Sequence, residues 1–567
     1  MQDNRNLILA IVLSAIVLIG WSIFFPTSTE ELPAEQPPQE QIADAPGGTD
    51  APVAAQPRTV DQALAEGGRV PIDTPLLKGS INLQGARIDD LSLVRHRYDQ
   101  KKNSEAIRLL SPAGTPKAYF AEAGWTGEGV ETPGPSTVWQ ASADRLTPEK
   151  PLTLTWENGT GQRFIQTISV DDGYLFTIER RVENRGEGAI AVRPYATARR
   201  AQATSDQSFW TVHLGPMGVF NDAAEYDIDY ETLDEEGRQR FTTTDGWVGF
   251  TDKYWLTAII PGKGESVTAN MRAVPSGGYQ VDYVSEPMLI APGQAKSGTT
   301  RLFAGAKEKE FLDRYEDEGV VRISKAIDWG WFEWFMRPIF DLLRWLFHVT
   351  GNFGVAIICL TFLVRLVLYP IANKQFRSMA GMRRIQPKLK ALQDRYKEDK
   401  PRLQQEMLKL YKEEKINPAA GCLPILLQIP IFYALYKVLL VSVEMRHQPF
   451  VLWLQDLSAP DPLTPVNLFG LLDFTPPSWI AIGILPILLG ITMWLQFKLN
   501  PQPMTDPVQK QVFGIMPWVL MVIMAPFAAG LQLYWVVSNI LTIAQQKWLY
   551  YRYDKEQEAS EHAAQKG

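Results

Sequence analysis

The chain has 567 residues, more than a single domain usually contains. Hydrophobic residues make up 46% of it and the formal net charge is −7, but both values average over unlike segments and do not indicate nucleic-acid binding. Both cysteines, Cys359 and Cys422, lie in apolar runs, which excludes a disulfide framework.

The N-terminus contains an uncharged apolar run, Leu7–Phe25. This run is long for a signal-peptide core and suits a membrane span, and the first small-x-small site, Ala43–Ala45, follows well beyond it. We therefore expect an uncleaved anchor over residues 1–26, with a cleaved signal peptide as the alternative. Residues 27–57 are rich in Pro, Glu and Ala, so they are expected to form an extended linker.

Residues 58–325 have the pattern of short β-strands. Alternate residues of one run, Tyr174, Phe176, Ile178 and Val182, fall on a single face, and turn sequences with Gly flank such runs. Several strands at this spacing predict a large β-sandwich.

This predicted β-domain shows no catalytic constellation. His96 and His213 are isolated in the sequence, no His, Cys and carboxylate cluster has metal-ligand spacing, and the chain has no P-loop pattern. We therefore expect neither enzyme activity nor a cofactor or metal site. Three tryptophans could line a sugar-binding groove, although packing in the core is the simpler interpretation; they are Trp210, Trp247 and Trp255.

Residues 326–348 are dense in Trp and Phe but are interrupted by charges such as Glu333 and Arg344. That composition predicts an amphipathic helix lying in the membrane interface. A core helix of the β-domain is the alternative.

Four apolar blocks follow: Gly351–Ile371, Cys422–Val441, Trp479–Phe497 and Val512–Trp548. The last block is too long for one crossing and is interrupted at residues 526–530, so it predicts two spans. With the N-terminal anchor, the total is six spans.

The basic residues predict the orientation of these spans. Residues 372–420 carry eight lysines and five arginines against six acids, which places this loop in the cytoplasm. The β-domain then lies outside, and six spans place both termini in the cytoplasm. Within the loop, apolar residues such as Met379, Leu392 and Leu410 recur at helical spacing, which predicts an antiparallel hairpin of two helices over 373–418. The apolar stripe of the hairpin suits either sealing of the two helices or binding of partners, and its basic face suits either lipid headgroups or ribosomal RNA.

Arg365 lies near the middle of an apolar block, where an arginine costs roughly 2.5–3.5 kcal/mol. The four blocks contain no Asp or Glu, and Lys437 is expected to snorkel to the outer interface. Arg365 either snorkels as well or is hydrated and available to a polar segment of another protein. Other polar side chains at similar depth predict a wet concavity, with helix–helix hydrogen bonding as the alternative; they are Thr361, Gln428, Trp535, Ser538 and Asn539.

Several stretches resemble the YidC-type membrane protein insertases of Gram-negative bacteria. They are residues 361–370 (TFLVRLVLYP), 417–436 (NPAAGCLPILLQIPIFYALY), 453–458 (WLQDLS) and 246–255 (GWVGFTDKYW). The resemblance implies an inner-membrane protein with a five-helix insertase core, here residues 349–553, a periplasmic all-β supersandwich and a cytoplasmic tail at 554–567. It also implies that Arg365, Thr361 and Gln428 line a client groove.

The same resemblance implies insertion and chaperoning of newly made membrane proteins, alone or with the Sec translocon and its accessory subunits. Membrane lipids are further partners, no specific nucleic acid sequence is expected, and the near-neutral tail leaves any weak ribosome contact to the hairpin. Two other classes remain open from the residues alone. A small-anion transporter could use Arg365 but lacks an internal repeat, and an anchored sugar-processing enzyme lacks a carboxylate pair.

Overall fold

The computed structural model describes residues 58–566 except 102, 207–211, 398, 415–422, 470, 473–476, 478–480 and 500–506. The predicted anchor (1–26) and linker (27–57), together with Trp210 and Cys422, lie outside the described residues.

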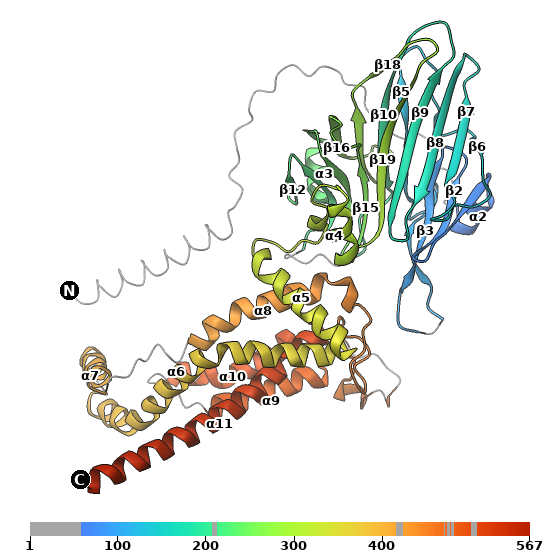
Figure 1. Ribbon diagram of the computed structural model, residues 1–567. Coiled ribbons are helices and arrows are strands. Elements are labelled where there is room, and N and C mark those ends of the chain that lie inside the picture. Colours follow the sequence, from blue (N-terminus) through green and yellow to red (C-terminus); the bar gives the residue numbers. More distant parts are fainter. Residues whose placement is uncertain are drawn as a thin grey trace. The chain divides into compact units, whose positions relative to one another are not determined.

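Antiparallel strands build the first part of the chain into two sheets (Figure 1). Among the described residues, ten strands form one sheet, whose main path runs β1-β2-β3-β5-β10-β17-β16-β13; nine form the other, in the order β12-β11-β14-β15-β19-β9-β8-β7-β6. The first sheet contains β1 (Arg69–Asp73), β2 (Leu77–Asn82), β3 (Arg87–Arg97), β4 (Ala106–Leu110), β5 (Tyr119–Gly127), β10 (Ile190–Arg200), β13 (Gln239–Thr243), β16 (Val267–Ala273), β17 (Tyr279–Ser285) and β18 (Met288–Ile290). The second contains β6 (Gln140–Ala141), β7 (Leu152–Glu157), β8 (Gln162–Val170), β9 (Leu175–Asn184), β11 (Gly215–Phe220), β12 (Ala223–Glu225), β14 (Gly246–Thr251), β15 (Trp255–Ile260) and β19 (Ala295–Ala306).

Strand β9 shows why this part of the sequence folds as a sandwich. Its inward residues Phe176, Ile178 and Val182 are buried, as the alternation predicts, because successive side chains of a strand point to opposite faces. The same face also holds Arg180, which is buried and donates a hydrogen bond from Nη1 to the carbonyl oxygen of Tyr195 (2.8 Å). The all-β prediction for this region is therefore confirmed.

Short helices accompany the sheets and longer ones follow them. The short helices are α2 (Val60–Ala65), α3 (Tyr230–Glu236), α4 (Lys309–Asp317) and the 3-10 turns η1 (Ile323–Ala326), η3 (Val443–Met445) and η4 (Pro465–Asn467). The long helices are α5 (Glu333–Thr350), α6 (Phe353–Arg395), α7 (Lys400–Glu413), α8 (Leu423–Val441), α9 (Ile484–Leu499), α10 (Pro507–Met524) and α11 (Ala529–Lys566).

Helix α5 occupies most of the aromatic segment. Its buried residues include Phe340 and Leu343, and it packs on α6 and α8, so its apolar face belongs to the helical bundle rather than to the core of the β-domain. Trp334 and Trp345 are exposed on the opposite side. Gly351 ends the helix in the left-handed conformation that glycine readily adopts.

Helix α6 runs through the whole of its apolar block and on into the basic loop, a length of 43 residues. The first helix of the basic loop is therefore continuous with the apolar helix that precedes it. Pro370 and Pro387 lie inside α6 without ending it. The residues after Pro370 are mostly strong helix formers, and proline is tolerated where other contacts hold a helix.

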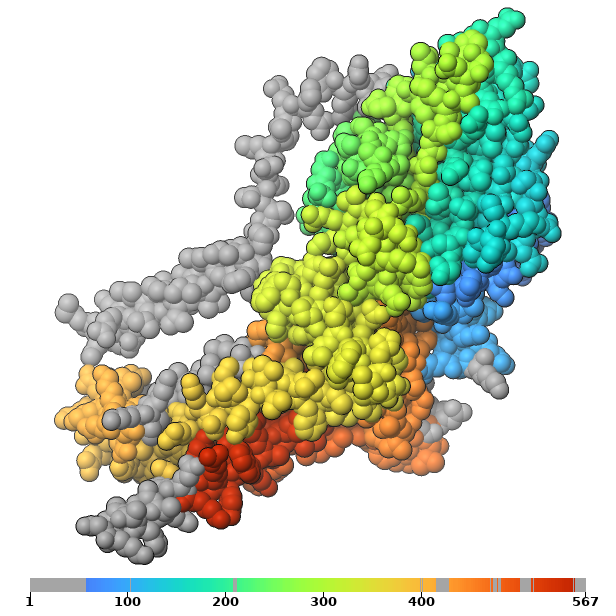
Figure 2. Space-filling model, in the orientation of Figure 1, coloured from blue at the N-terminus to red at the C-terminus, as the bar shows by residue number. Residues whose placement is uncertain are grey.

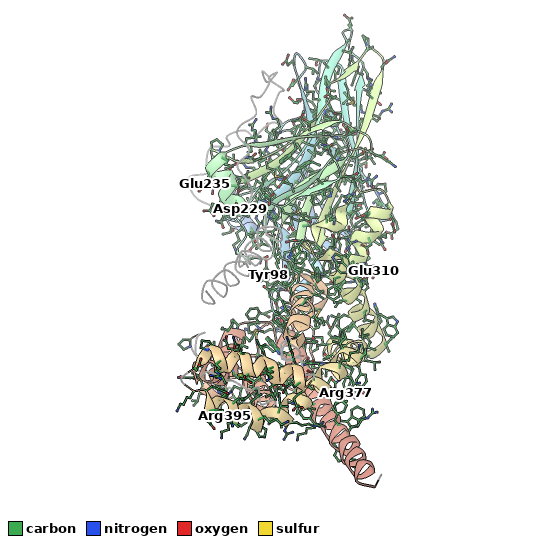
Figure 3. All side chains as sticks on the ribbon, turned by 90° about the vertical axis from the view of Figure 1, so that its left-hand side faces the viewer. Tyr98, Asp229, Glu235, Glu310, Arg377 and Arg395 are labelled. Carbon is green, nitrogen blue, oxygen red and sulfur yellow. The ribbon has the colours of Figure 1, made fainter. Side chains whose placement is uncertain are left out.

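The two helices of the basic loop do pair. Lys388 of α6 and Glu414 at the end of α7 form an ion pair, and a cavity of about 310 Å³ lies between the helices. The basic side chains Arg377 and Arg395 are exposed on α6 (Figure 3). On its other side, Phe376 packs edge-on against Tyr550 of α11, with the ring centroids 6.3 Å apart.

Helix α11 packs against α6, α8 and α9, and Figure 2 shows the surfaces of α6 (yellow) and α11 (red) side by side. The break between α10 and α11 falls at residues 525–528, where the Pro and Gly of the last apolar block predict a turn. By length and composition, one helix in the described part of the chain, Phe353–Arg395, suffices to cross a membrane; Gln428–Val441, Ile484–Leu499 and Gly514–Met524 are shorter apolar helices. The count of six spans is therefore not confirmed.

Candidate functional site

Arg365 is half-buried on α6 and turns toward α11. Its Nη2 donates hydrogen bonds to the hydroxyl oxygen of Ser538 (2.6 Å) and to the carbonyl oxygen of the same residue (3.2 Å). No carboxylate pairs with Arg365 in the described residues, as the apolar blocks predict. The neutral Ser538 therefore holds one side of the guanidinium.

A second contact joins α8 to α11 one turn earlier. Gln428 is half-buried, and its Nε2 donates a hydrogen bond to the hydroxyl oxygen of Tyr534 (2.9 Å). One turn further along α8, the ring of Phe432 lies 4.8 Å from that of Trp535, which is also half-buried. Arg365 and Gln428 are thus fixed by two successive turns of α11.

The remaining predicted site residues are buried and serve the helices themselves. Thr361 is only 1% exposed and donates its hydroxyl hydrogen bond to the carbonyl oxygen of Ile357 (2.7 Å). Asn539 is buried and donates from Nδ2 to the hydroxyl of Thr492 on α9 (3.1 Å). Both side chains thus form hydrogen bonds within the bundle, and neither is exposed on its surface.

Lys437 does not snorkel. It is 1% exposed, and its Nζ lies 3.1 Å from Oδ2 of Asp328, in the segment that precedes α5. The same carboxylate oxygen accepts a hydrogen bond from the backbone N–H of His213 (3.1 Å), and Oδ1 accepts one from Gly330 (2.9 Å). Asp328 lies outside the apolar blocks, so the composition of those blocks gives no sign of this ion pair.

Trp247 and Trp255, the two described members of the three tryptophans considered for a sugar groove, do not lie exposed on a common surface. Trp247 is buried in the core. Trp255 packs edge-on against His96, with the ring centroids 5.1 Å apart, and the guanidinium of Arg446 lies over the Trp255 ring, 5.6 Å from its centroid. His96 is also not isolated in space, because its Nε2 lies 3.1 Å from Oε1 of Glu308.

The bundle thus presents a small set of half-exposed polar and aromatic side chains that a buried layer supports. The half-exposed set is Arg365, Gln428 and Trp535, and the supporting set is Thr361, Tyr534, Ser538 and Asn539. Such a surface can bind a peptide through a positive charge, an amide and an aromatic ring, and it holds no general acid–base pair. The supporting role of Tyr534 gave no local signal, since a tyrosine in an apolar block is ordinarily a packing residue.

Comparisons with known proteins cover both parts of the chain. The family model described as the 60Kd inner membrane protein matches residues 345–557, and the model of the YidC periplasmic domain matches residues 69–342. An insertase named YidC from Zymomonas mobilis is 46% identical over 100% of this chain and 98% of its own length. Another from Beijerinckia indica is 44% identical over 96% of this chain and 95% of its own length.

Among solved structures, a crystal structure of an active YidC insertase with its first transmembrane domain resolved is 18% identical, covers 84% of this chain and 92% of its own, and has a TM-score of 0.37. The sequence relatives named above are insertases and lend no support to a small-anion transporter. One family model is thus that of an inner membrane protein, the other is that of a periplasmic domain, and both relatives are named membrane protein insertases. The chain belongs to the YidC family of membrane protein insertases.

Proposed function

We propose that the half-exposed side chains of the bundle are the part of this insertase that polar client segments contact. These side chains are Arg365, Gln428 and Trp535. The observation that carries the proposal is the neutral partner of Arg365: Ser538 orients the guanidinium without cancelling its charge. A fixed positive charge of this kind attracts an acidic client segment by up to a few kcal/mol at the effective dielectric near a protein surface.

The client itself supplies the free energy of insertion. Transfer of its apolar helix into lipid is favourable by roughly 25 cal/mol per Å² of buried apolar surface, so no nucleotide is required. The protein lowers the barrier for the polar flank, which would otherwise cross the hydrocarbon without hydrogen-bond partners. Gln428 and Ser538 offer such partners next to the charge.

We further propose six spans with both termini in the cytoplasm, the interfacial position of residues 326–348, and an insertase core over 349–553. The Sec translocon with its accessory subunits and, through the basic hairpin, the ribosome are the proposed partners in addition to nascent membrane proteins. The exposed basic residues of α6 support the last of these, because they are available to anionic surfaces.

The proposal is tested by measuring insertion by two variants, Arg365→Lys and Arg365→Ala. The clients compared differ only in the charge of the translocated segment. Lysine keeps the charge and should retain most insertion, whereas alanine should slow an acidic client about tenfold, or ~1.4 kcal/mol, and spare a neutral one. Arg377→Ala, which removes an exposed arginine from the same helix, is the matched control and should affect both clients equally. If alanine unfolds the protein, or leaves every client unaffected, the role assigned to Arg365 is wrong.

A further inference from the structure

The connection between α8 and α9 contains an apolar turn that faces outward. From Pro462 to Leu472 the sequence has no Asp, Glu, Lys or Arg. Its leucines do not pack inward: Leu468 is 53% exposed and Leu471 is 83% exposed. Contiguous exposed apolar side chains of this kind mark a surface that contacts a membrane or another protein.

Hydrogen bonds fix the base of this turn to the first residues of α9. The buried carboxylate of Asp461 accepts hydrogen bonds from the indole Nε1 of Trp453 (3.0 Å), from the backbone N–H of Leu463 (3.1 Å) and from that of Leu485 (2.7 Å). The N–H of Ile484 in turn donates to the carbonyl oxygen of Leu463 (3.1 Å). The base of the turn is therefore level with the N-terminus of α9.

The length of α9 places that N-terminus within the membrane. The helix has 16 residues, or about 24 Å, whereas the hydrocarbon core is about 30 Å thick. At its other end Lys498 lies over the ring of Trp494, 5.0 Å from the centroid, which is an arrangement typical of the membrane–water interface. Measured from that interface, Ile484 falls short of the opposite boundary, so apolar surface beside it meets acyl chains.

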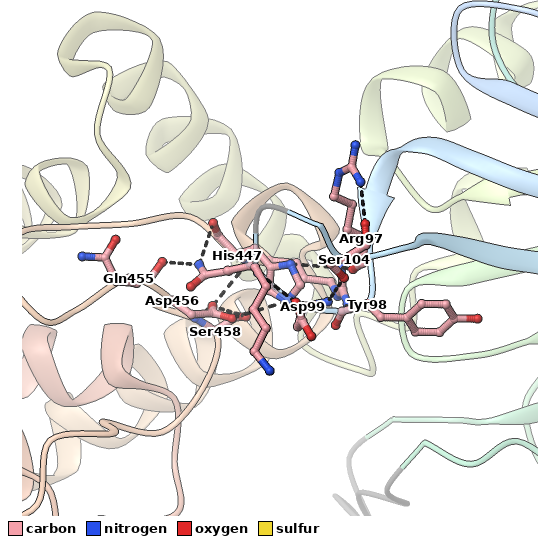
Figure 4. A network of polar contacts seen from close by, with 11 residues as sticks. Arg97, Tyr98, Asp99, Ser104, His447, Gln455, Asp456 and Ser458 are labelled. Carbon is pink, nitrogen blue, oxygen red and sulfur yellow. Dashed lines mark hydrogen bonds and ion pairs between the residues drawn. The ribbon is translucent and has the colours of Figure 1, made fainter. Parts of the chain in front are cut away.

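Contacts with the β-domain identify the leaflet. Residues after α8 lie against the turn between β3 and β4, where the side-chain Nε2 of Gln100 donates to the carbonyl oxygen of His447 (3.1 Å). Arg446 donates from Nη1 to the carbonyl oxygen of Arg97 (2.7 Å). Figure 4 shows Arg97 and His447 in this network. Since the β-domain is periplasmic in this family, the turn lies on the periplasmic side.

The backbone of the turn is also unusual. Leu468 and Phe469 are consecutive non-glycine residues with positive φ, +50° and +60°. Each such residue costs about 1–2 kcal/mol, and strained positions are concentrated in functional segments. Both strained residues carry exposed side chains, Leu468 at 53% and Phe469 at 51%.

We propose that the turn formed by the described residues from Thr464 to Leu472 inserts into the periplasmic leaflet as a shallow anchor and binds lipid acyl chains. Lipid is favoured over a protein partner because the turn offers no charged side chain for recognition and its base is bonded to the start of α9, a helix that carries exposed apolar residues such as Leu488 and Ile491. The anchor is additional to the insertase activity and independent of the role proposed for Arg365.

Environment-sensitive fluorescence tests this anchor in the full-length protein in lipid nanodiscs. In a background with Cys359→Ala and Cys422→Ala, single cysteines replace Leu468 or Leu471 and carry a polarity-sensitive dye. Leu289→Cys is the matched control, because this leucine is 64% exposed on β18 of the β-domain. We expect a blue-shifted emission, loss of quenching by aqueous iodide and strong quenching by brominated acyl chains at both turn positions, with the reverse at residue 289.

Water exposure at both turn positions would overturn the proposal, and would indicate that the bilayer thins to match α9. A dye that is shielded from iodide, is not quenched by brominated acyl chains, and loses its shielding when the protein is diluted in lipid would indicate contact with a second copy of this chain. Shielding that requires another membrane protein would assign it to a protein partner. Each of these outcomes contradicts a lipid anchor, and agreement between two positions guards against a local effect of the dye.

Discussion

Removing the carboxylate of Asp328 should destabilise the helical bundle more than removing the lysine that it pairs with. Asp328→Asn leaves the ammonium of Lys437 without its ion-pair partner at a site where the side chain is 1% exposed. Breaking a buried pair in this way costs about 3–5 kcal/mol. Lys437→Met removes the buried charge itself and adds apolar volume.

The remaining carboxylate explains the asymmetry. In Lys437→Met, Asp328 still accepts hydrogen bonds from the backbone N–H groups of His213 and Gly330, and its side chain is 15% exposed. We therefore expect a loss of about 1–2 kcal/mol for this variant. The double variant, Asp328→Asn with Lys437→Met, should recover much of the stability lost in Asp328→Asn, because no charge is then left buried.

Thermal unfolding in detergent, followed by the reaction of Cys359 on α6 with a thiol-reactive dye, measures these differences. Asp341→Asn is the matched control, since this aspartate of α5 is 53% exposed in its pair with Lys309 and should change stability by less than about 0.5 kcal/mol. An Asp328→Asn variant as stable as the wild type, or one more stable than Lys437→Met, would refute the reasoning.

Three further outcomes are expected. Burial lowers the pKa of Lys307 to about 8. Because the unfolded lysine keeps its proton to a higher pH, the free energy of unfolding should increase by on the order of 3 kcal/mol as the pH rises from 8 to 10.5. Lys307→Met should abolish this increase when unfolding is measured as a function of pH. Hydrogen exchange in nanodiscs should be fastest in 400–413, where none of residues 401–413 is buried, and slower in 376–395, which continues α6; equal rates would show that the hairpin moves as one unit. Deleting residues 60–310 while keeping Asp328 should leave insertion of a simple client near normal, and complete loss in a stably expressed deletion would contradict the placement of the client surface in the bundle.

Local signals in the sequence predicted the elements that depend on neighbouring residues. Strict alternation marked β9, and Pro526 with Gly530 marked the break between α10 and α11, because strand faces and turns are set within a few residues. The continuation of α6 past Pro370 was not predicted, since a proline is read locally as a helix boundary while packing against α11 decides the outcome.

Pairings between distant segments could not be read in the same way. Asp328 and Lys437 are 109 residues apart, and Arg365 meets Ser538 across 173 residues. The sequence identified most of the polar residues of the bundle, but the rotation of each helix about its axis decides which of them are half-exposed. Thr361 and Asn539 were therefore grouped with Gln428 although the bundle buries them.

Site-specific crosslinking to a stalled nascent membrane protein tests the proposed client surface most directly. A photoreactive residue at Gln428 or Trp535 should crosslink to the client, whereas one at Thr361, which is 1% exposed, should not. A crosslink at all three positions in equal yield would show that clients enter the buried layer. No crosslink at Gln428 and Trp535, in variants that still insert the client, would contradict the assignment of this surface.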